Sequence, residues 1–273
     1  MAMRPQDAER VADYFSRRGT VTEWWNPEEG PLAFHYAAEL QVLEDALAVD
    51  PSWQVLDVGT GPGRFGLWFA AKGCRVIGVD LNPEMQERAR EAARRRGLEA
   101  RFEVRAGRAE DLREFESARF DRVLCMELFD HLPDLGAALA AMRRVMAPGG
   151  RFLFTYVPRE SLYGMLGNVY RALKARFSPQ ELMISRTYGF DEVVRALRGA
   201  GFELERHFGV GALCVSAQTR FFGESAFQRA ATALARAESR RWPYHEGGFL
   251  GRRGAHVVGI ARAASDPAAR ASA

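Results

Sequence analysis

The chain has almost no lysine, although it is not poor in basic residues. Only Lys72 and Lys174 are lysine, so arginine supplies 36 of the 38 basic side chains, while the formal net charge is only +3. Arginine runs such as residues 94–96 alternate with glutamates, which is typical of a solvated helix face. Because no concentrated basic surface is evident, we predict no nucleic-acid partner.

Cysteine is also scarce, and long hydrophobic runs are absent. Cys74, Cys125 and Cys214 lie in apolar, strand-like contexts without paired spacing. This excludes a C-x-x-C zinc site and is typical of free thiols in a reducing compartment. The first residues contain no hydrophobic signal core, and no apolar run is long enough to span a bilayer. We therefore expect a cytoplasmic protein with no membrane partner.

Residues 55–65 contain the most informative pattern: an apolar strand, a glycine-rich turn and the start of a helix. Gly59, Gly61 and Gly63 allow the backbone to pass close to a ligand, because a Cβ atom there would collide with it. The next strand ends at Asp80, 19 positions after Gly61, where an acid suits the hydroxyls of a ribose. The pattern predicts a nucleoside-bearing cofactor.

The same turn formally matches the dinucleotide fingerprint G-x-G-x-x-G from Gly61 to Gly66. This match leaves a nicotinamide-dependent oxidoreductase as an alternative. Two residues argue against it. The charge of Asp57 would repel a pyrophosphate and attract a cationic group such as an α-ammonium, and Pro62 removes an N–H that a phosphate would need.

Five motifs in order over about residues 40 to 157 resemble the class I S-adenosylmethionine-dependent methyltransferases. The first is similar to D-x-G-x-G-x-G, and the others are residues 79–85, 106–112, 120–134 and 139–154. The resemblance implies S-adenosyl-L-methionine as the cofactor. It implies these cofactor-binding residues: Asp57, Gly59, Gly61, Gly63, Asp80, Leu81, Ala109, Glu110 and Glu127. Arg108 stands where many relatives place Asp, so the Ala109 N–H or Glu110 is expected to contact the adenine instead.

Strands and helices alternate through the central part of the chain. Strands are expected near 53–58, 74–80, 101–105, 120–126 and 151–157, and helices near 64–72, 83–96 and 135–146. We predict an α/β, doubly wound Rossmann-like fold with a mostly parallel sheet and an antiparallel edge strand. Residues 1–50 form an N-terminal helical lid segment, 51–262 a methyltransferase domain with a helical cap insertion at about 159–184, and 263–273 a disordered tail.

His131 and Tyr156 are the predicted catalytic residues. His131 follows the fourth strand, where a base would take a proton from a neutral oxygen acceptor, and Tyr156 directly follows the fifth strand. Glu127, Asp130 and His131 also resemble the acid-x-x-acid-His segment that ubiquinone-pathway O-methyltransferases associate with a divalent cation. A metal is kept as the alternative there, and none is predicted, because this short pattern recurs widely.

The sequence therefore predicts in-line methyl transfer to a small-molecule O- or N-acceptor, aromatic or apolar, positioned under a lid. A homodimer is compatible with the sequence. A non-methylating or binding-only member of the same fold is a further alternative, whereas RNA methylation is disfavoured because no Asn-Pro-Pro-Tyr type segment is present. Aromatic and methionine candidates for the acceptor pocket are Trp24, Trp25, Tyr36, Tyr163, Met165, Tyr170, Met183, Phe208, Phe221 and Phe222.

Overall fold

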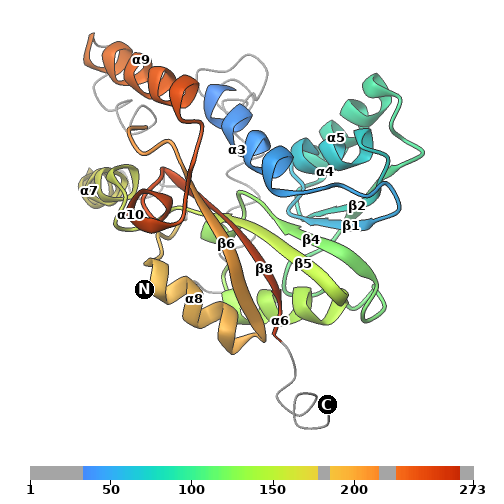
Figure 1. Cartoon of the computed structure of the whole chain (residues 1–273). Coiled ribbons are helices and arrows are strands. Elements are labelled where there is room, and N and C mark those ends of the chain that lie inside the picture. Colours follow the sequence, from blue (N-terminus) through green and yellow to red (C-terminus); the bar gives the residue numbers. More distant parts are fainter. Residues whose placement is uncertain (1–32, 178–184, 215–225, 265–273) are drawn as a thin grey trace.

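The computed structural model describes residues 33–177, 185–214 and 226–264, whose strands form an eight-stranded sheet covered by helices (Figure 1). Its strand order is β3-β2-β1-β4-β5-β8-β6-β7. The strands are β1 (Gln54–Val58), β2 (Arg75–Asp80), β3 (Phe102–Ala106), β4 (Phe120–Cys125), β5 (Met146–Tyr156), β6 (Phe202–Val210), β7 (His245–Glu246) and β8 (His256–Ala263). Pairing from β3 to β5 is parallel, and β8 and its neighbours pair antiparallel. The predicted fold class is confirmed.

Helices cover both faces of the sheet. On one face lie α3 (Ala33–Ala46), α4 (Arg64–Ala71) and α5 (Pro83–Arg96), and on the other lie α6 (Leu135–Val145) and α8 (Phe190–Gly199). Further along are η1 (Phe129–His131), α7 (Leu162–Phe177), α9 (Ala226–Arg241) and α10 (Gly248–Gly251). Successive strand residues point to opposite faces of the sheet. Val55 therefore packs in the core on the side of α3, α4 and α5, and Leu56 packs in the core on the side of α6 and α8.

Helix α5 shows how local chemistry sets element bounds. Asn82 precedes it and accepts a hydrogen bond from the Glu84 N–H, Pro83 occupies the first turn, and Gly97 ends the helix in the left-handed region. The predicted bounds of 83–96 are confirmed. Strand β5 differs from its predicted start at 151, because Met146 already pairs with Phe120 before a register shift restores the pairing at Arg122.

Several predictions fall on residues that the structure does not describe. Most of the N-terminal lid segment and nearly all of the predicted tail lie outside the described residues, as do Trp24, Trp25, Met183, Phe221 and Phe222. The described part of the N-terminal segment, α3, packs Val42 and Leu43 fully buried against the sheet. None of the described helices combines the length and apolar character that a membrane span requires.

The aromatic core of β5 gives a stability prediction. Phe152 is fully buried and its ring lies 5.1 Å from that of Phe154 and 5.0 Å from that of Phe202. We expect Phe152→Ala to lower the free energy of unfolding in urea by about 3–5 kcal/mol, because it removes buried area and leaves a cavity. Phe249→Ala, at a side chain that is 67% exposed, should change it by less than about 1 kcal/mol. Equal losses in the two variants would contradict this placement of the core.

Candidate active site

The turn after β1 is built from three glycines in the left-handed region. Their φ angles are 70° at Gly59, 52° at Gly61 and 86° at Gly63. A Cβ atom on Gly59 would lie 2.6 Å from Leu128 Cδ2, whereas one on Gly61 would meet no atom within 4 Å. At Gly59 the turn therefore packs tightly against Leu128, whereas at Gly61 it borders open space. Gly61 is the position expected to approach a ligand.

Two aspartates hold this turn in place. Asp57 is buried in β1, and its Oδ2 accepts hydrogen bonds from Thr60 Oγ1 at 2.7 Å and from the Gly66 N–H at 3.0 Å. At the end of β2, Asp80 accepts from the Gly61 N–H and the Asn82 N–H, each at 2.8 Å. Burial raises the pKa of Asp57 to about 6 and also raises the pKa of Asp80. Asp80 thus lies beside Gly61, and Asp57 anchors the turn to α4.

The predicted adenine turn follows β3. Leu81 is half-buried and Ala109 is buried. Glu110 Oε1 is buried and has no hydrogen-bond partner among the described residues, while Glu110 Oε2 lies 3.9 Å from Arg108 Nε. A buried carboxylate oxygen without a donor is costly, so this atom is ready to accept a hydrogen bond from a ligand amine.

The sequence interpretation did not single out Arg64, which the structure places beside the glycine turn. Its guanidinium carbon lies 3.7 Å from the centre of the Tyr36 ring, and its buried Nε and Nη1 have no hydrogen-bond partner in the described structure. Arg64 is the first residue of α4, directly after the glycine turn. That position was the available signal, since a side chain there lies beside the turn and a guanidinium binds carboxylates well.

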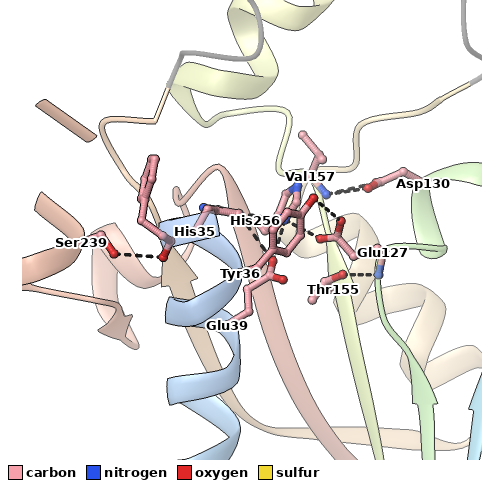
Figure 2. A network of polar contacts seen from close by, with 10 residues as sticks. His35, Tyr36, Glu39, Glu127, Asp130, Thr155, Val157, Ser239 and His256 are labelled. Atoms are coloured by element: carbon pink, nitrogen blue, oxygen red, sulfur yellow. Dashed lines mark hydrogen bonds and ion pairs between the residues drawn. The ribbon is translucent and has the colours of Figure 1, made fainter. Parts of the chain in front are cut away.

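Glu127 follows β4 in a strained backbone conformation. Its φ of 60° is in the left-handed region, which is unfavourable for a glutamate, and such strain clusters at functional sites. The Glu127 N–H donates to Thr155 Oγ1 at 2.7 Å, and the Tyr36 hydroxyl donates to Glu127 Oε2 at 3.4 Å (Figure 2). These contacts hold the side chain at the carboxyl edge of the sheet.

The three residues of the predicted metal alternative do not form a ligand set in the described structure. The Asp130 carboxylate instead accepts from the Val157 N–H at 3.0 and 3.1 Å, and burial raises its pKa to about 7. His131 is half-buried in η1, and its backbone N–H donates to the Leu128 carbonyl at 2.8 Å. Asp130 therefore fixes the end of β5 rather than facing a cation together with Glu127.

Tyr156 packs inside the core. It is 1% exposed, its hydroxyl has no hydrogen-bond partner among the described residues, and its ring lies 6.3 Å from Phe154 and 6.2 Å from Phe129. Burial raises its pKa well above the ordinary value. Of the acceptor-pocket candidates, Tyr36 and Phe208 are also buried, while Met165 is 50% exposed. The catalytic assignment of Tyr156 stays a prediction.

A buried histidine–glutamate cluster was also missed by the sequence interpretation. His256 Nδ1 lies 2.7 Å from Glu39 Oε1, 2.8 Å from Glu127 Oε1 and 3.0 Å from His35 Nε2 (Figure 2). Burial alone would lower the pKa of His256, but the two carboxylates raise it well above the ordinary value. His35 and Glu39 are one helical turn apart in α3, which was the only local signal, because His256 is 221 residues from His35.

The raised pKa of Asp57 predicts how stability varies with pH in the cofactor-free protein. Its pKa is about 6 in the fold and 3.8 as the reference value, so the fold favours the neutral form. This contribution is fully present below about pH 4 and is lost as the pH rises through about 6, by an amount of about 3 kcal/mol. Relative to Asp57→Asn, the wild type should lose that stability in urea titrations between about pH 4 and about pH 7.

The control for this pH experiment is Asp111→Asn. Asp111 is exposed and the Arg113 side chain lowers its pKa to about 2, so its titration falls below the measured window. The difference in the free energy of unfolding between the wild type and Asp111→Asn should stay constant between about pH 4 and about pH 7. If the difference between the wild type and Asp57→Asn stayed constant as well, Asp57 would not be a buried carboxyl group with a raised pKa.

Comparisons with known proteins give the family of the chain. Residues 56–154 match the family described as a methyltransferase domain. The chain is 35% identical over 153 residues to the ubiquinone biosynthesis O-methyltransferase of Hahella chejuensis, covering 54% of this chain and 63% of that protein. It is 30% identical over 190 residues to the protein of the same name from Xylella fastidiosa strain M23, covering 67% and 74%.

A solved structure shows the same fold. The S-adenosylmethionine-dependent methyltransferase of Thermotoga maritima, described as a possible histamine N-methyltransferase, superposes with a TM-score of 0.64 at 23% identity, covering 92% of this chain and 98% of that one. The chain spans 63% and 62% of the length of the ubiquinone biosynthesis O-methyltransferases of Hahella chejuensis and Alkalilimnicola ehrlichii, which is less than two thirds.

The residues present fit the adenosylmethionine cofactor. Open space borders Gly61, Asp80 lies beside it, and Glu110 Oε1 and two Arg64 nitrogens are buried without partners in the described structure. With the match of residues 56–154 and the identity to the Xylella fastidiosa protein, this site completes the assignment. The chain belongs to the class I S-adenosylmethionine-dependent methyltransferases, and S-adenosyl-L-methionine is its cofactor.

Proposed function

We propose that the protein transfers the methyl group of S-adenosylmethionine to an oxygen or nitrogen of a small aromatic or apolar molecule. The observation that carries this proposal is the open space at Gly61, bordered by Asp80 and near buried polar atoms that lack partners in the described structure. The name of the curated relatives, ubiquinone biosynthesis O-methyltransferase, favours an oxygen acceptor. The cofactor supplies the electrophilic methyl group, so the protein mainly positions the reactants.

Three groups would orient the cofactor. Asp80 would accept hydrogen bonds from the ribose hydroxyls, and Glu110 would accept one from the adenine amine beside Leu81 and Ala109. The guanidinium of Arg64 would bind the carboxylate of the methionine end, because its Nε and Nη1 are buried without a hydrogen-bond partner in the described residues. These contacts would hold the cofactor at the carboxyl ends of the parallel strands.

His131 is the proposed general base. It lies in η1, four residues after the strained Glu127, on the side of the sheet edge where β4 ends. A neutral hydroxyl acceptor must lose its proton during transfer, and an imidazole accepts one at working pH. Tyr156, the second predicted catalytic residue, is buried, so it would reach an acceptor only if the segments packed over it moved.

Helix α7 is the proposed lid. It lies within the insertion at about 159–184 and carries exposed apolar side chains along one stripe, at Leu162, Leu166, Val169, Leu173 and Phe177. Closing a lid of this kind over the acceptor would exclude water from the reaction. The part of the predicted lid segment that precedes α3 lies outside the described residues.

Arg64 gives a test of cofactor orientation. Arg64→Met keeps much of the side-chain volume but removes a charge-assisted hydrogen-bond pair of about 1.5–3 kcal/mol, so the Kd of S-adenosylmethionine should rise about 10- to 100-fold. Methylthioadenosine lacks the carboxylate, and its Kd should hardly change. Isothermal titration of both ligands measures this difference.

The matched variant is Asp80→Ala, which should weaken both ligands because both carry the ribose. Glu87→Ala, on the exposed face of α5, should weaken neither. If Arg64→Met weakened methylthioadenosine as much as S-adenosylmethionine, the proposed contact to the carboxylate would be wrong. If the wild type bound neither ligand, the proposed function itself would fail.

His131 gives a test of the chemistry. Labelled cofactor and a metabolite extract, followed by mass spectrometry of the products, first identify an acceptor. With that acceptor, His131→Ala should lower kcat by about 10²- to 10⁴-fold while the Kd of S-adenosylmethionine stays near the wild-type value. Near-normal turnover would exclude His131 as the base and favour an acceptor that is already nucleophilic. Binding of the cofactor without any methylated product would favour the binding-only alternative.

A further inference from the structure

The cluster of His35, Glu39, Glu127 and His256 lies at the carboxyl edge of the sheet but has no part in the proposed transfer of the methyl group through His131. Helix α3 contributes His35 and Glu39, β8 contributes His256, and the turn after β4 contributes Glu127 (Figure 2). His35, Glu39 and His256 are 3%, 0% and 7% exposed. Among the described residues, these three are the one group of histidines, cysteines and acids close enough to share a metal ion.

Hydrogen bonds alone cannot satisfy this cluster. His256 Nδ1 carries at most one proton, yet two carboxylate oxygens and one ring nitrogen lie within 3.0 Å of it. Glu39 Oε2 and His35 Nδ1 are buried and have no hydrogen-bond partner in the described structure. Two carboxylates in such a place carry a large desolvation cost unless positive charge compensates them.

The spacing of the donor atoms suits a small divalent cation. The triangle formed by His35 Nε2, Glu39 Oε1 and His256 Nδ1 has sides of 3.5, 3.0 and 2.7 Å. Ligands about 2.0–2.1 Å from a tetrahedral Zn²⁺ lie about 3.3 Å apart, so the atoms would shift by only about half an ångström. The lone pairs of His35 Nε2, Glu39 Oε1 and His256 Nδ1 would then all bind the ion, whereas without it they compete for the same proton.

We propose that His35 Nε2, Glu39 Oε1 and His256 Nδ1 bind a divalent transition-metal ion of the Zn²⁺ type, with a water molecule in the fourth position. Two imidazoles exclude Mg²⁺ and Ca²⁺, which take oxygen ligands, and the lack of thiolates disfavours Cu⁺. This ligand set shares no residue with the Glu127–Asp130–His131 segment.

The ion would tie α3, which carries His35 and Glu39, to β8, which carries His256. Because such a site does not exist in the unfolded chain, metal binding would stabilise the fold.

The test measures Zn²⁺ on the full chain. After dialysis against a chelator, competition with a chromophoric chelator should give one tight site per chain, and Co²⁺ should bind there with the visible absorption of a tetrahedral complex. His35→Ala, Glu39→Gln and His256→Ala should each weaken Zn²⁺ at least about 10- to 100-fold and remove the Co²⁺ absorption. His245→Ala, at a half-buried histidine outside the cluster, should change neither.

Circular dichroism separates loss of metal from loss of fold. Glu39→Gln keeps the side-chain volume, so it remains informative if a histidine variant does not fold. The proposal is overturned if the folded wild type binds no stoichiometric Zn²⁺ or Co²⁺, or if Glu39→Gln binds them as tightly as the wild type. Titration of S-adenosylmethionine into the metal-free chain tests the cofactor site separately, so failure of the metal site and failure of the proposed function are distinguishable.

Discussion

The parallel pairing of β1 with β2 on one side and with β4 on the other is the constraint on which the site depends. Because parallel strands end at the same edge, it brings together the glycine turn after β1, Asp80 at the end of β2 and Glu127 after β4. The strand order reverses next to β1, because β2 and β3 lie on one side of it and β4 and β5 on the other. In open α/β sheets, a ligand binds at this point, beyond the carboxyl ends of the strands. Helices on both faces bury the strands, so that this edge is held rigidly.

The same edge concentrates buried carboxyl groups. Burial raises the pKa of Asp57 to about 6 and that of Asp130 to about 7, so each carries an electrostatic cost in the cofactor-free fold. Each also orients backbone, since Asp57 accepts from the Gly66 N–H and Asp130 from the Val157 N–H. Burying Asp57 and Asp130 thus lowers the stability of the free fold, and their hydrogen bonds hold the glycine turn and the end of β5 in place.

Local patterns predicted the strand, glycine turn and helix at residues 55–65, the acid at the end of β2 and the bounds of α5. The left-handed conformation of the glycines and the contact between Asp80 and Gly61 were not predicted and are seen only in the structure. The burial of Tyr156 did not follow from local patterns, because it depends on which face of β5 the residue occupies and on what packs there. The proximity of His35 and His256 could not be predicted either, because 221 residues separate them in the chain. They come together only because β8 pairs antiparallel with β5.

Charge balance connects the two halves of the edge. Arg64 is a positive group close to Tyr36, Glu127 and Glu39, and burial raises the pKa values of Asp57 and Asp80 at the same edge. S-adenosylmethionine would bring the positive charge of its sulfonium and α-ammonium to this edge. In the proposed binding mode its carboxylate would meet Arg64 Nε and Nη1, which are buried and have no hydrogen-bond partner among the described residues. The cost of burying these acids in the free protein would then be offset when the cofactor binds.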